Sequence, residues 1–175
     1  MTELHVLCRA EPLHTDYHFE AILRRIDEHP EEVSVEDYET AALPLHLVLK
    51  SDPPLLVIKA LVELYPEALR EENNLGLLPL HVACRYGVSP KVASYLIEQY
   101  PDAVTKPTRT QTGLQVCEHS FQDPYETIHY LATGGKGLSC RNLVSKLPND
   151  HPHRAGLLAL LSSKSFSTTS TPTIY

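Results

Sequence analysis

The chain has 175 residues, a length that suits one globular domain or a short repeat array and is too short for two large domains. Of these residues 42% are hydrophobic and 21% charged, which is an ordinary composition for a globular protein. Its formal net charge of −7 repels phosphate backbones at long range, so nucleic acid is an unfavourable partner. The four cysteines form no Cys-x-x-Cys pair, and no stretch approaches the roughly 20 apolar residues that cross a bilayer, which argues against a disulfide scaffold and against membrane insertion.

The start of the chain carries no recognisable targeting signal. Residues 1–5 lack the basic start and the apolar stretch of a signal peptide, and the Arg and Ser enrichment of a transit peptide is also missing. Together with the scattered thiols, this favours a cytoplasmic or nuclear protein. The acidic residues between Asp27 and Glu39, which include Glu31, Glu32 and Asp37, are interpreted as a solvated outer edge.

Two motifs repeat at one interval in the middle of the chain. Leu-Pro-Leu-His at 43–46 recurs 35 residues later at 78–81, and Tyr-Pro-Glu-Ala at 65–68 recurs 35 residues later as Tyr-Pro-Asp-Ala at 100–103. Weaker copies flank this pair, with Leu-His-Val-Leu-Cys at 4–8 before it and Gly-Leu-Gln-Val-Cys at 113–117 after it. The first copy is longer, with an insertion near residues 12–17. The interval predicts four units, at about 3–33, 41–69, 76–104 and 110–131.

Each unit is predicted to form two short helices joined by a turn. In the third unit, Pro79 suits the first turn of an inner helix that ends at Gly87. Ser89 is expected to cap an outer helix, and Pro101 to end it. Apolar residues at helical spacing give the outer helices one apolar face, with Val57, Ile58, Leu61 and Val62 in the second unit and Val92, Ala93, Leu96 and Ile97 in the third. Because helices this short are marginal alone, we predict an all-α stack of helix pairs.

The end of the chain is predicted to close this stack. Residues 139–161 can form a further helix pair, and residues 155–161 are too apolar to remain exposed, so we expect them to cap the last unit. The Gly-Gly-Lys-Gly run at 134–137 is interpreted as a flexible turn. Residues 1–161 would then form one repeat domain, followed by a disordered tail rich in Ser and Thr at 162–175.

The Leu-Pro-Leu-His motif, with Val82, Ala83, Cys84 and Gly87 after it, resembles the inner helix of an ankyrin repeat, whose signature is Thr-Pro-Leu-His-x-Ala. The resemblance covers about residues 3–131 and is strongest at 76–104. This variant is similar to ankyrin arrays of diatoms and related algae. It departs from the family where Leu43 and Leu78 replace the threonine, where Tyr-Pro-x-Ala replaces Gly-Ala-Asp, and where Gln115 replaces the histidine. It implies an ankyrin-like helical-hairpin solenoid of about four repeats with a C-terminal capping helix pair.

For the histidines and cysteines, a structural role is favoured over a catalytic or metal-binding one. The resemblance implies that His5, His46 and His81 hydrogen-bond backbone groups and tie neighbouring turns together. The pairs His5/Cys8 and His81/Cys84 each place two zinc ligand types on one helix, but two whole repeats separate them, so one zinc could not reach both. No Gly-x-Ser-x-Gly motif occurs, no local signature sets a histidine beside Cys140, and residues 134–137 lack the spacing of a phosphate loop. We therefore expect no cofactor, no metal and no enzymatic activity.

The resemblance implies instead that another protein binds a concave face of turn tips and inner helices. The family pattern selects Glu39, Thr40, Ala42, Lys50, Ser51, Asn74, Leu75, Leu77, Arg85, Tyr86, Thr108, Arg109, Gln111, His119 and Ser120. Arg85 and Tyr86 are the best anchors, because binding hot spots favour Arg and Tyr. Two alternatives stay open. One is a structural accessory subunit packed into a larger assembly through its apolar C-terminal helix pair, and the other is a small metal or thiol enzyme.

Overall fold

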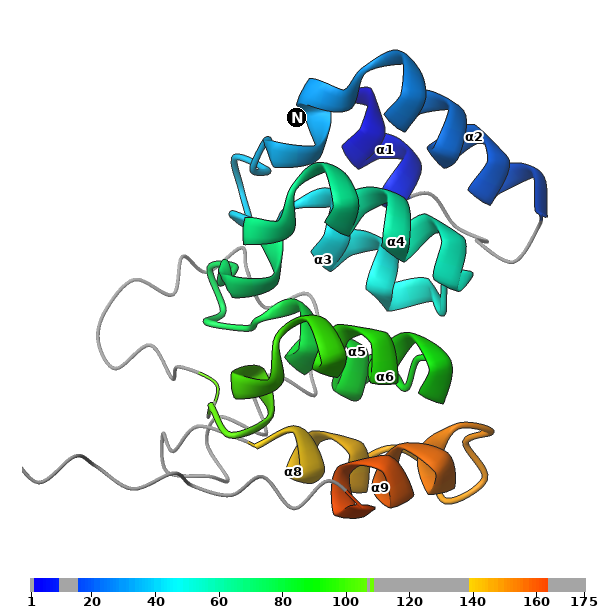
Figure 1. Ribbon diagram of the computed structural model, residues 1–175, viewed down its shortest axis with the longest axis vertical. Coiled ribbons are helices and arrows are strands. Elements are labelled where there is room, and N and C mark those ends of the chain that lie inside the picture. Colours follow the sequence, from blue (N-terminus) through cyan, green and yellow to red (C-terminus); the bar gives the residue numbers. More distant parts are fainter. Residues whose placement is uncertain (1, 10–15, 107, 109–138, 164–175) are drawn as a thin grey trace, which may run out of the picture.

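The computed structural model describes residues 2–9, 16–106, 108 and 139–163, and every regular element within them is a helix, which confirms the all-α class. Figure 1 shows four tiers of paired helices, one below another. The pairs are α1 (Glu3–Arg9) with α2 (Asp16–Glu28), α3 (Pro44–Val48) with α4 (Leu55–Leu64), α5 (Pro79–Tyr86) with α6 (Pro90–Gln99), and α8 (Cys140–Ser145) with α9 (Arg154–Ser163). None of these helices has the length and apolar character needed to cross a bilayer.

The inner helices begin and end where their local chemistry predicts. Pro79 opens α5, and Gly87 ends it in the left-handed conformation, at φ 72°. In the second unit a short 3-10 helix, η2 (Leu49–Ser51), continues α3 and ends at Asp52, which is also left-handed at φ 48°. Ser89 stands at the N-cap of α6, but its side chain makes no capping hydrogen bond. Its backbone N–H donates instead to Asp52 Oδ1 at 2.6 Å, so the expected cap is replaced by a link between units.

The Tyr-Pro motifs and the His29-Pro30 pair form a recurring 3-10 turn after the outer helices α2, α4 and α6. These turns are η1 (Pro30–Ser34), η3 (Pro66–Arg70) and η4 (Pro101–Val104). The residue before each proline takes nearly the same φ, which is −138° at His29, −140° at Tyr65 and −143° at Tyr100. Proline keeps the preceding residue out of the α region, and this ends the outer helix. The weak first copy therefore has the same backbone path as the two stronger ones.

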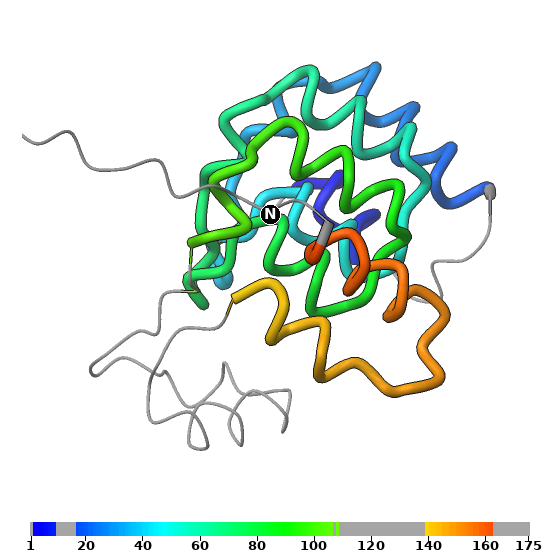
Figure 2. Tube along the Cα trace, turned by 60° about the horizontal axis from the view of Figure 1, so that its bottom comes forward, coloured from blue at the N-terminus to red at the C-terminus, as the bar shows by residue number. Residues whose placement is uncertain are grey.

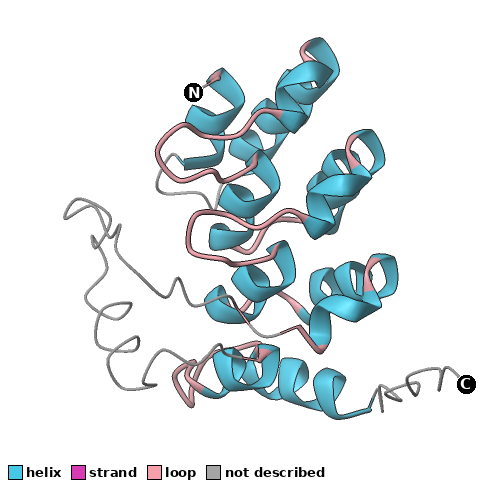
Figure 3. Ribbon diagram, turned by 90° about the vertical axis from the view of Figure 1, so that its left-hand side faces the viewer, coloured by secondary structure: helices cyan, strands magenta, loops and turns pink. Residues whose placement is uncertain are grey.

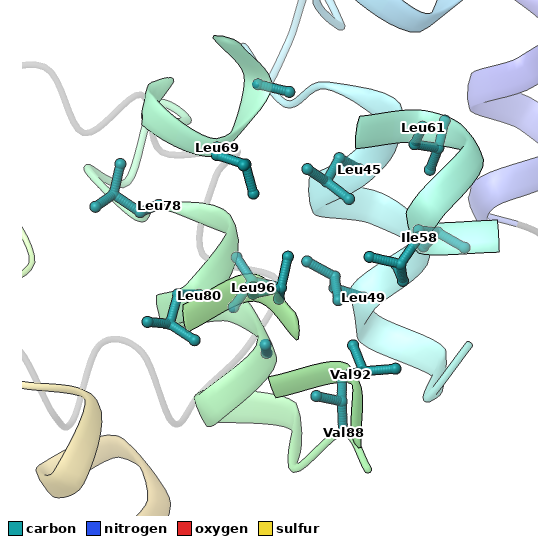
Figure 4. Close-up of a cluster of buried hydrophobic side chains, with 14 of the residues drawn as sticks. Leu45, Leu49, Ile58, Leu61, Leu69, Leu78, Leu80, Val88, Val92 and Leu96 are labelled. Atoms are coloured by element: carbon teal, nitrogen blue, oxygen red, sulfur yellow. The ribbon is translucent and has the colours of Figure 1, made fainter. Parts of the chain in front are cut away.

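The core runs through the stack as two columns of helices, which Figure 2 shows in an oblique view. Inner helices contact inner helices, from α1 through α3 and α5 to α8, and outer helices contact outer helices, from α2 through α4 and α6 to α9. Figure 4 shows Leu45 and Leu49 from the second unit together with Ile58, facing Val92 and Leu96 of the third. These five side chains are almost completely buried, and burial of one such side chain stabilises by about 1.5–3 kcal/mol.

The pair α8–α9 lies directly beside α5 and α6, the place where chain order predicts the unit of residues 110–131. Cys140, Val144 and Leu157 are fully buried in this contact region, so the C-terminal pair supplies the apolar face that a fourth unit would provide. Residues 110–131 and the expected turn at 134–137 lie outside the described residues. The boundaries of two other segments differ from those predicted, because α2 already begins at Asp16 and α9 extends through residues 162–163.

Two acidic residues of the predicted solvated edge are buried instead, so that prediction was wrong for them. Glu32 accepts a hydrogen bond from the Leu4 N–H at 2.9 Å and others from the Arg25 guanidinium, which lowers the pKa of Glu32 to about 2. Asp37 accepts a hydrogen bond from Arg9 Nη2 at 2.6 Å. A buried carboxylate is tolerated when it is paired and hydrogen-bonded in this way.

Candidate protein-binding face

His46 joins the second inner helix to the turn that follows in the next unit. Its Nδ1 accepts the backbone N–H of Leu43 at 3.2 Å, which leaves the proton on Nε2 for donation to the Leu77 carbonyl oxygen, 3.1 Å away. Burial lowers the pKa of His46 to about 4, so the ring is neutral near pH 7. The expected structural role of this histidine is confirmed.

His81 repeats the arrangement one unit later. Its Nδ1 accepts the N–H of Leu78 at 3.1 Å, and its Nε2 lies 2.9 Å from the Lys106 carbonyl oxygen. Both ring nitrogens are therefore engaged by the backbone, while Cys84 on the same helix is buried beside Cys140. Within the part of the chain that the structure describes, no group of three or more His, Cys, Asp or Glu side chains is arranged to hold a metal ion.

The first unit contains a feature that the sequence comparison missed. Thr2 stands three residues before His5, and its Oγ1 lies 2.7 Å from His5 Nδ1. This is the threonine-to-histidine contact that Leu43 and Leu78 cannot make. Burial lowers the pKa of His5, while the Asp37 carboxylate acts in the opposite direction. The sequence Thr2-Glu3-Leu4-His5 contains this signal, because the threonine stands where the family motif has it.

The turn tips form one continuous strip along the side of the stack. Figure 3 shows these loops projecting together from the inner helices. The Asn74 N–H donates to the Thr40 carbonyl oxygen at 2.9 Å, and Asn74 Nδ2 donates to the Glu39 carbonyl oxygen at 3.1 Å. Leu75, beside them, is 37% exposed. Three of the predicted site residues, Glu39, Thr40 and Asn74, are thus joined by hydrogen bonds between neighbouring turns.

A second cluster lies at the C-terminal ends of the inner helices. Lys50 Nζ lies 5.9 Å from the centre of the Tyr86 ring, and Arg85 Cζ lies 5.8 Å from the same ring, so two units contribute to one cation–π cluster. Tyr86 is 37% exposed. Three of the residues that the family pattern selected on these helix ends, Lys50, Arg85 and Tyr86, therefore form one cluster.

Other predicted site residues are buried or lie outside the described residues. Four that were predicted to face a partner are buried: Ala42, Ser51, Leu77 and Thr108. Leu77 is only 8% exposed because both of its backbone groups are used, the N–H by the Asn73 side chain and the carbonyl oxygen by His46. Outside the described residues are Arg109, Gln111, His119 and Ser120.

Two further cations at the ends of inner helices, Arg9 and Lys146, were not predicted as site residues. Arg9 reaches Asp37 and lies 3.5 Å from the Thr40 hydroxyl, at the turn tips. Lys146 is exposed at the end of α8. Partial burial lowers the pKa of Lys146, and repulsion by the neighbouring Arg85 lowers it further. Their position in each unit was the available signal, because each follows the start of its inner helix at the same distance as Lys50 and Arg85.

No protein-family model matches this sequence, and a search of curated proteins finds no match.

Proposed function

We propose that this chain is a protein-binding module, an ankyrin-like helical-hairpin solenoid that holds its partner on the inner-helix ends and turn tips. The observation that carries the proposal is the cluster of Lys50, Arg85 and Tyr86, which two helix pairs build jointly, with Lys50 and Tyr86 exposed and Arg85 half-buried. Tyr and Arg are enriched among the residues that dominate binding energy, and a Tyr ring loses little conformational freedom on binding because it has only two side-chain torsions.

The hydrogen bonds of His46 and His81 favour a binding function over a catalytic one. His46 and His81 engage both ring nitrogens with backbone groups, so neither ring is available as a general base without breaking a link between units. Cys8, Cys84 and Cys140 are free thiols and all three are buried. Free thiols suit the reducing cytoplasm or nucleus, where we place the protein.

The accessory-subunit alternative requires apolar residues of the C-terminal pair to be available on the surface. Leu157 and Leu161 are buried instead, and α9 packs against α6. A Cβ atom added at Gly156 would lie 2.7 Å from Pro90 Cγ, which illustrates how closely the two helices approach. Because Leu157 and Leu161 pack inside this chain and are not available to another subunit, the binding-module proposal is the better supported of the two.

Affinity capture with a matched pair of double variants tests the proposal. Arg85→Ala with Tyr86→Ala removes two anchors, and we expect the captured partner to be lost while the helical circular dichroism signal is unchanged. The control is Tyr17→Ala with Lys59→Ala, which removes an exposed tyrosine and an exposed lysine from the outer helices α2 and α4. Equal recovery of the partner by both variants would refute this face as the binding site.

A further inference from the structure

Each of the four described inner helices carries a cation at the same register position. The residues that directly precede these helices are Thr2, Leu43, Leu78 and Ser139. Seven positions after each of them the residue is basic, namely Arg9, Lys50, Arg85 and Lys146. We call these four residues the cation row. Only 15 of the 175 residues are Lys or Arg, in a chain with a net charge of −7, so composition does not account for the coincidence.

Three members of the cation row lie near one another. Lys50 and Arg85 lie 5.9 Å and 5.8 Å from the same Tyr86 ring. Repulsion by Arg85, together with the larger effect of burial, lowers the pKa of Lys146. At the other end, Arg9 pairs with Asp37 at 2.6 Å. A ligand of opposite charge would be attracted to a surface on which basic residues recur from one helix pair to the next.

Stabilisation of helix ends does not explain the cation row. A cation in the last turn of a helix interacts favourably with the helix dipole, and this holds for inner and outer helices alike. The outer helices α4, α6 and α9 have no basic residue in their last turn. In α2 the basic residue is Arg25, which binds the buried Glu32. The regular placement is therefore a property of the inner face.

We propose that the cation row binds an acidic segment of the partner protein, with Asp or Glu carboxylates lying opposite successive helix pairs. This inference rests on the proposed function, because it names the chemistry of the ligand at the same face. Packed helices are about 8–10 Å apart, and an extended chain rises about 3.3 Å per residue, so carboxylates at every third residue match the spacing. A protein ligand is favoured over nucleic acid because the rest of the chain is acidic and repels a continuous polyanion.

Selection from a library of random twelve-residue peptides on the folded full chain tests this inference. We expect the selected peptides to be rich in Asp and Glu, and their binding, measured by fluorescence anisotropy of labelled copies, to weaken as salt rises. Lys50→Glu with Arg85→Glu should weaken binding by about tenfold or more, because it reverses two adjacent charges. Lys59→Glu with Lys91→Glu makes the same change in net charge on the outer helices α4 and α6 and should leave the affinity within about twofold. Lys146→Gln, a milder change at an exposed position, provides a second variant should charge reversal impair folding.

The possible failures separate the two proposals. Neutral or apolar peptides whose binding is lost in Arg85→Ala with Tyr86→Ala would overturn the acidic ligand and support the binding face. Acidic peptides that bind the inner and outer charge-reversal variants equally would overturn the cation row as their site. Face-dependent binding of a labelled single-stranded DNA, tighter than that of every acidic peptide, would overturn a protein ligand. If no selected peptide depended on this face, both the acidic ligand and the proposed function would be contradicted.

Discussion

At the scale of single residues, the left-handed positions show where the repeat is strained. Gly76 and Gly87 have positive φ angles of 66° and 72°, and the equivalent residues 35 positions earlier are Ala41 and Asp52, at 47° and 48°. The left-handed conformation costs a residue with a Cβ atom roughly 1–2 kcal/mol. The Asp52 carboxylate compensates through hydrogen bonds to later elements, whereas the methyl group of Ala41 cannot hydrogen-bond.

Ala41→Gly should therefore stabilise the protein. We expect the free energy of unfolding to rise by about 0.5–1 kcal/mol, because relief of the left-handed strain exceeds the entropy that glycine adds to the unfolded chain. Urea unfolding followed by circular dichroism measures the change. Ala60→Gly, inside α4, is the control and should destabilise by about 1 kcal/mol. A decrease in stability for Ala41→Gly would show that this turn is not strained.

His46 predicts how stability depends on pH. Its pKa is 6.5 in the unfolded chain and about 4 in the folded protein, so between these values the unfolded state binds more protons. Stability is therefore full above about pH 6.5 and decreases as the pH falls toward 4. The difference between the two pKa values corresponds to about 3 kcal/mol.

Unfolding free energies measured between pH 7 and pH 4 test this dependence. His46→Gln cannot titrate in this range, so its stability should change less across it, although the variant should be less stable at pH 7. His5, whose pKa is also lowered by burial, remains in both proteins and contributes the same background. Identical pH slopes for the variant and the unaltered chain would contradict the assignment to His46.

At the scale of elements, the end of α5 is packed beneath the connection between α8 and α9. A Cβ atom at Gly87 would lie 2.4 Å from His151 Cε1 and 2.9 Å from Leu147 Cδ1. The glycine is thus required for two reasons, which are its positive φ and the close approach of this connection. The same glycine ends an inner helix and seats the C-terminal pair.

Gly87→Ala should lower the free energy of unfolding by about 2 kcal/mol or more, because backbone strain and steric overlap add. Chemical denaturation provides the measurement. His151→Ala, introduced with Gly87→Ala, should restore part of the loss, since it removes the ring that the new methyl group meets and leaves the φ strain in place. Complete restoration would mean that the positive φ carries no cost, and no restoration would mean that the contact with His151 is unimportant.

At the scale of the whole molecule, each helix pair depends on its neighbours for burial. The columns α1–α3–α5–α8 and α2–α4–α6–α9 share one apolar core, so an end that loses its neighbour exposes buried side chains. The pair α8–α9 covers the end formed by α5 and α6. Stability in such stacks is approximately the sum of contributions from units and from the contacts between them.

Shortening the chain after residue 138 should therefore destabilise the rest of the stack. We expect a loss of several kcal/mol, because burial of Leu157 and Leu143 alone contributes about 1.5–3 kcal/mol each. Binding of a dye specific for exposed apolar surface should increase, and thermal unfolding should begin at a lower temperature. Shortening after residue 163 keeps α9 intact and should change neither measurement. Unchanged stability of the shorter chain would contradict the role of α8–α9 as the cover of the stack.

Sequence reasoning anticipated the ends of the inner helices better than the charged contacts. Pro79, Gly87 and the Tyr-Pro turns act through their own backbone preferences, which are local. The partners of Glu32 could not be inferred as readily, because one of them, Leu4, is 28 residues away and belongs to another helix. Leu77 was placed on the binding face by its position in the motif, but its backbone hydrogen bonds draw it into the core.

The sequence by itself determined the helical class, the interval of the units and the ends of the inner helices, because periodicity and the conformational limits of proline and glycine operate over a few residues. Only the tertiary structure decided that α8–α9 lies against α5–α6, that Glu32 and Asp37 are buried, and that Lys50 and Arg85 from separate units meet at the Tyr86 ring. These features depend on distances between segments far apart in the chain. Packing of the whole stack sets those distances, and no local preference specifies them.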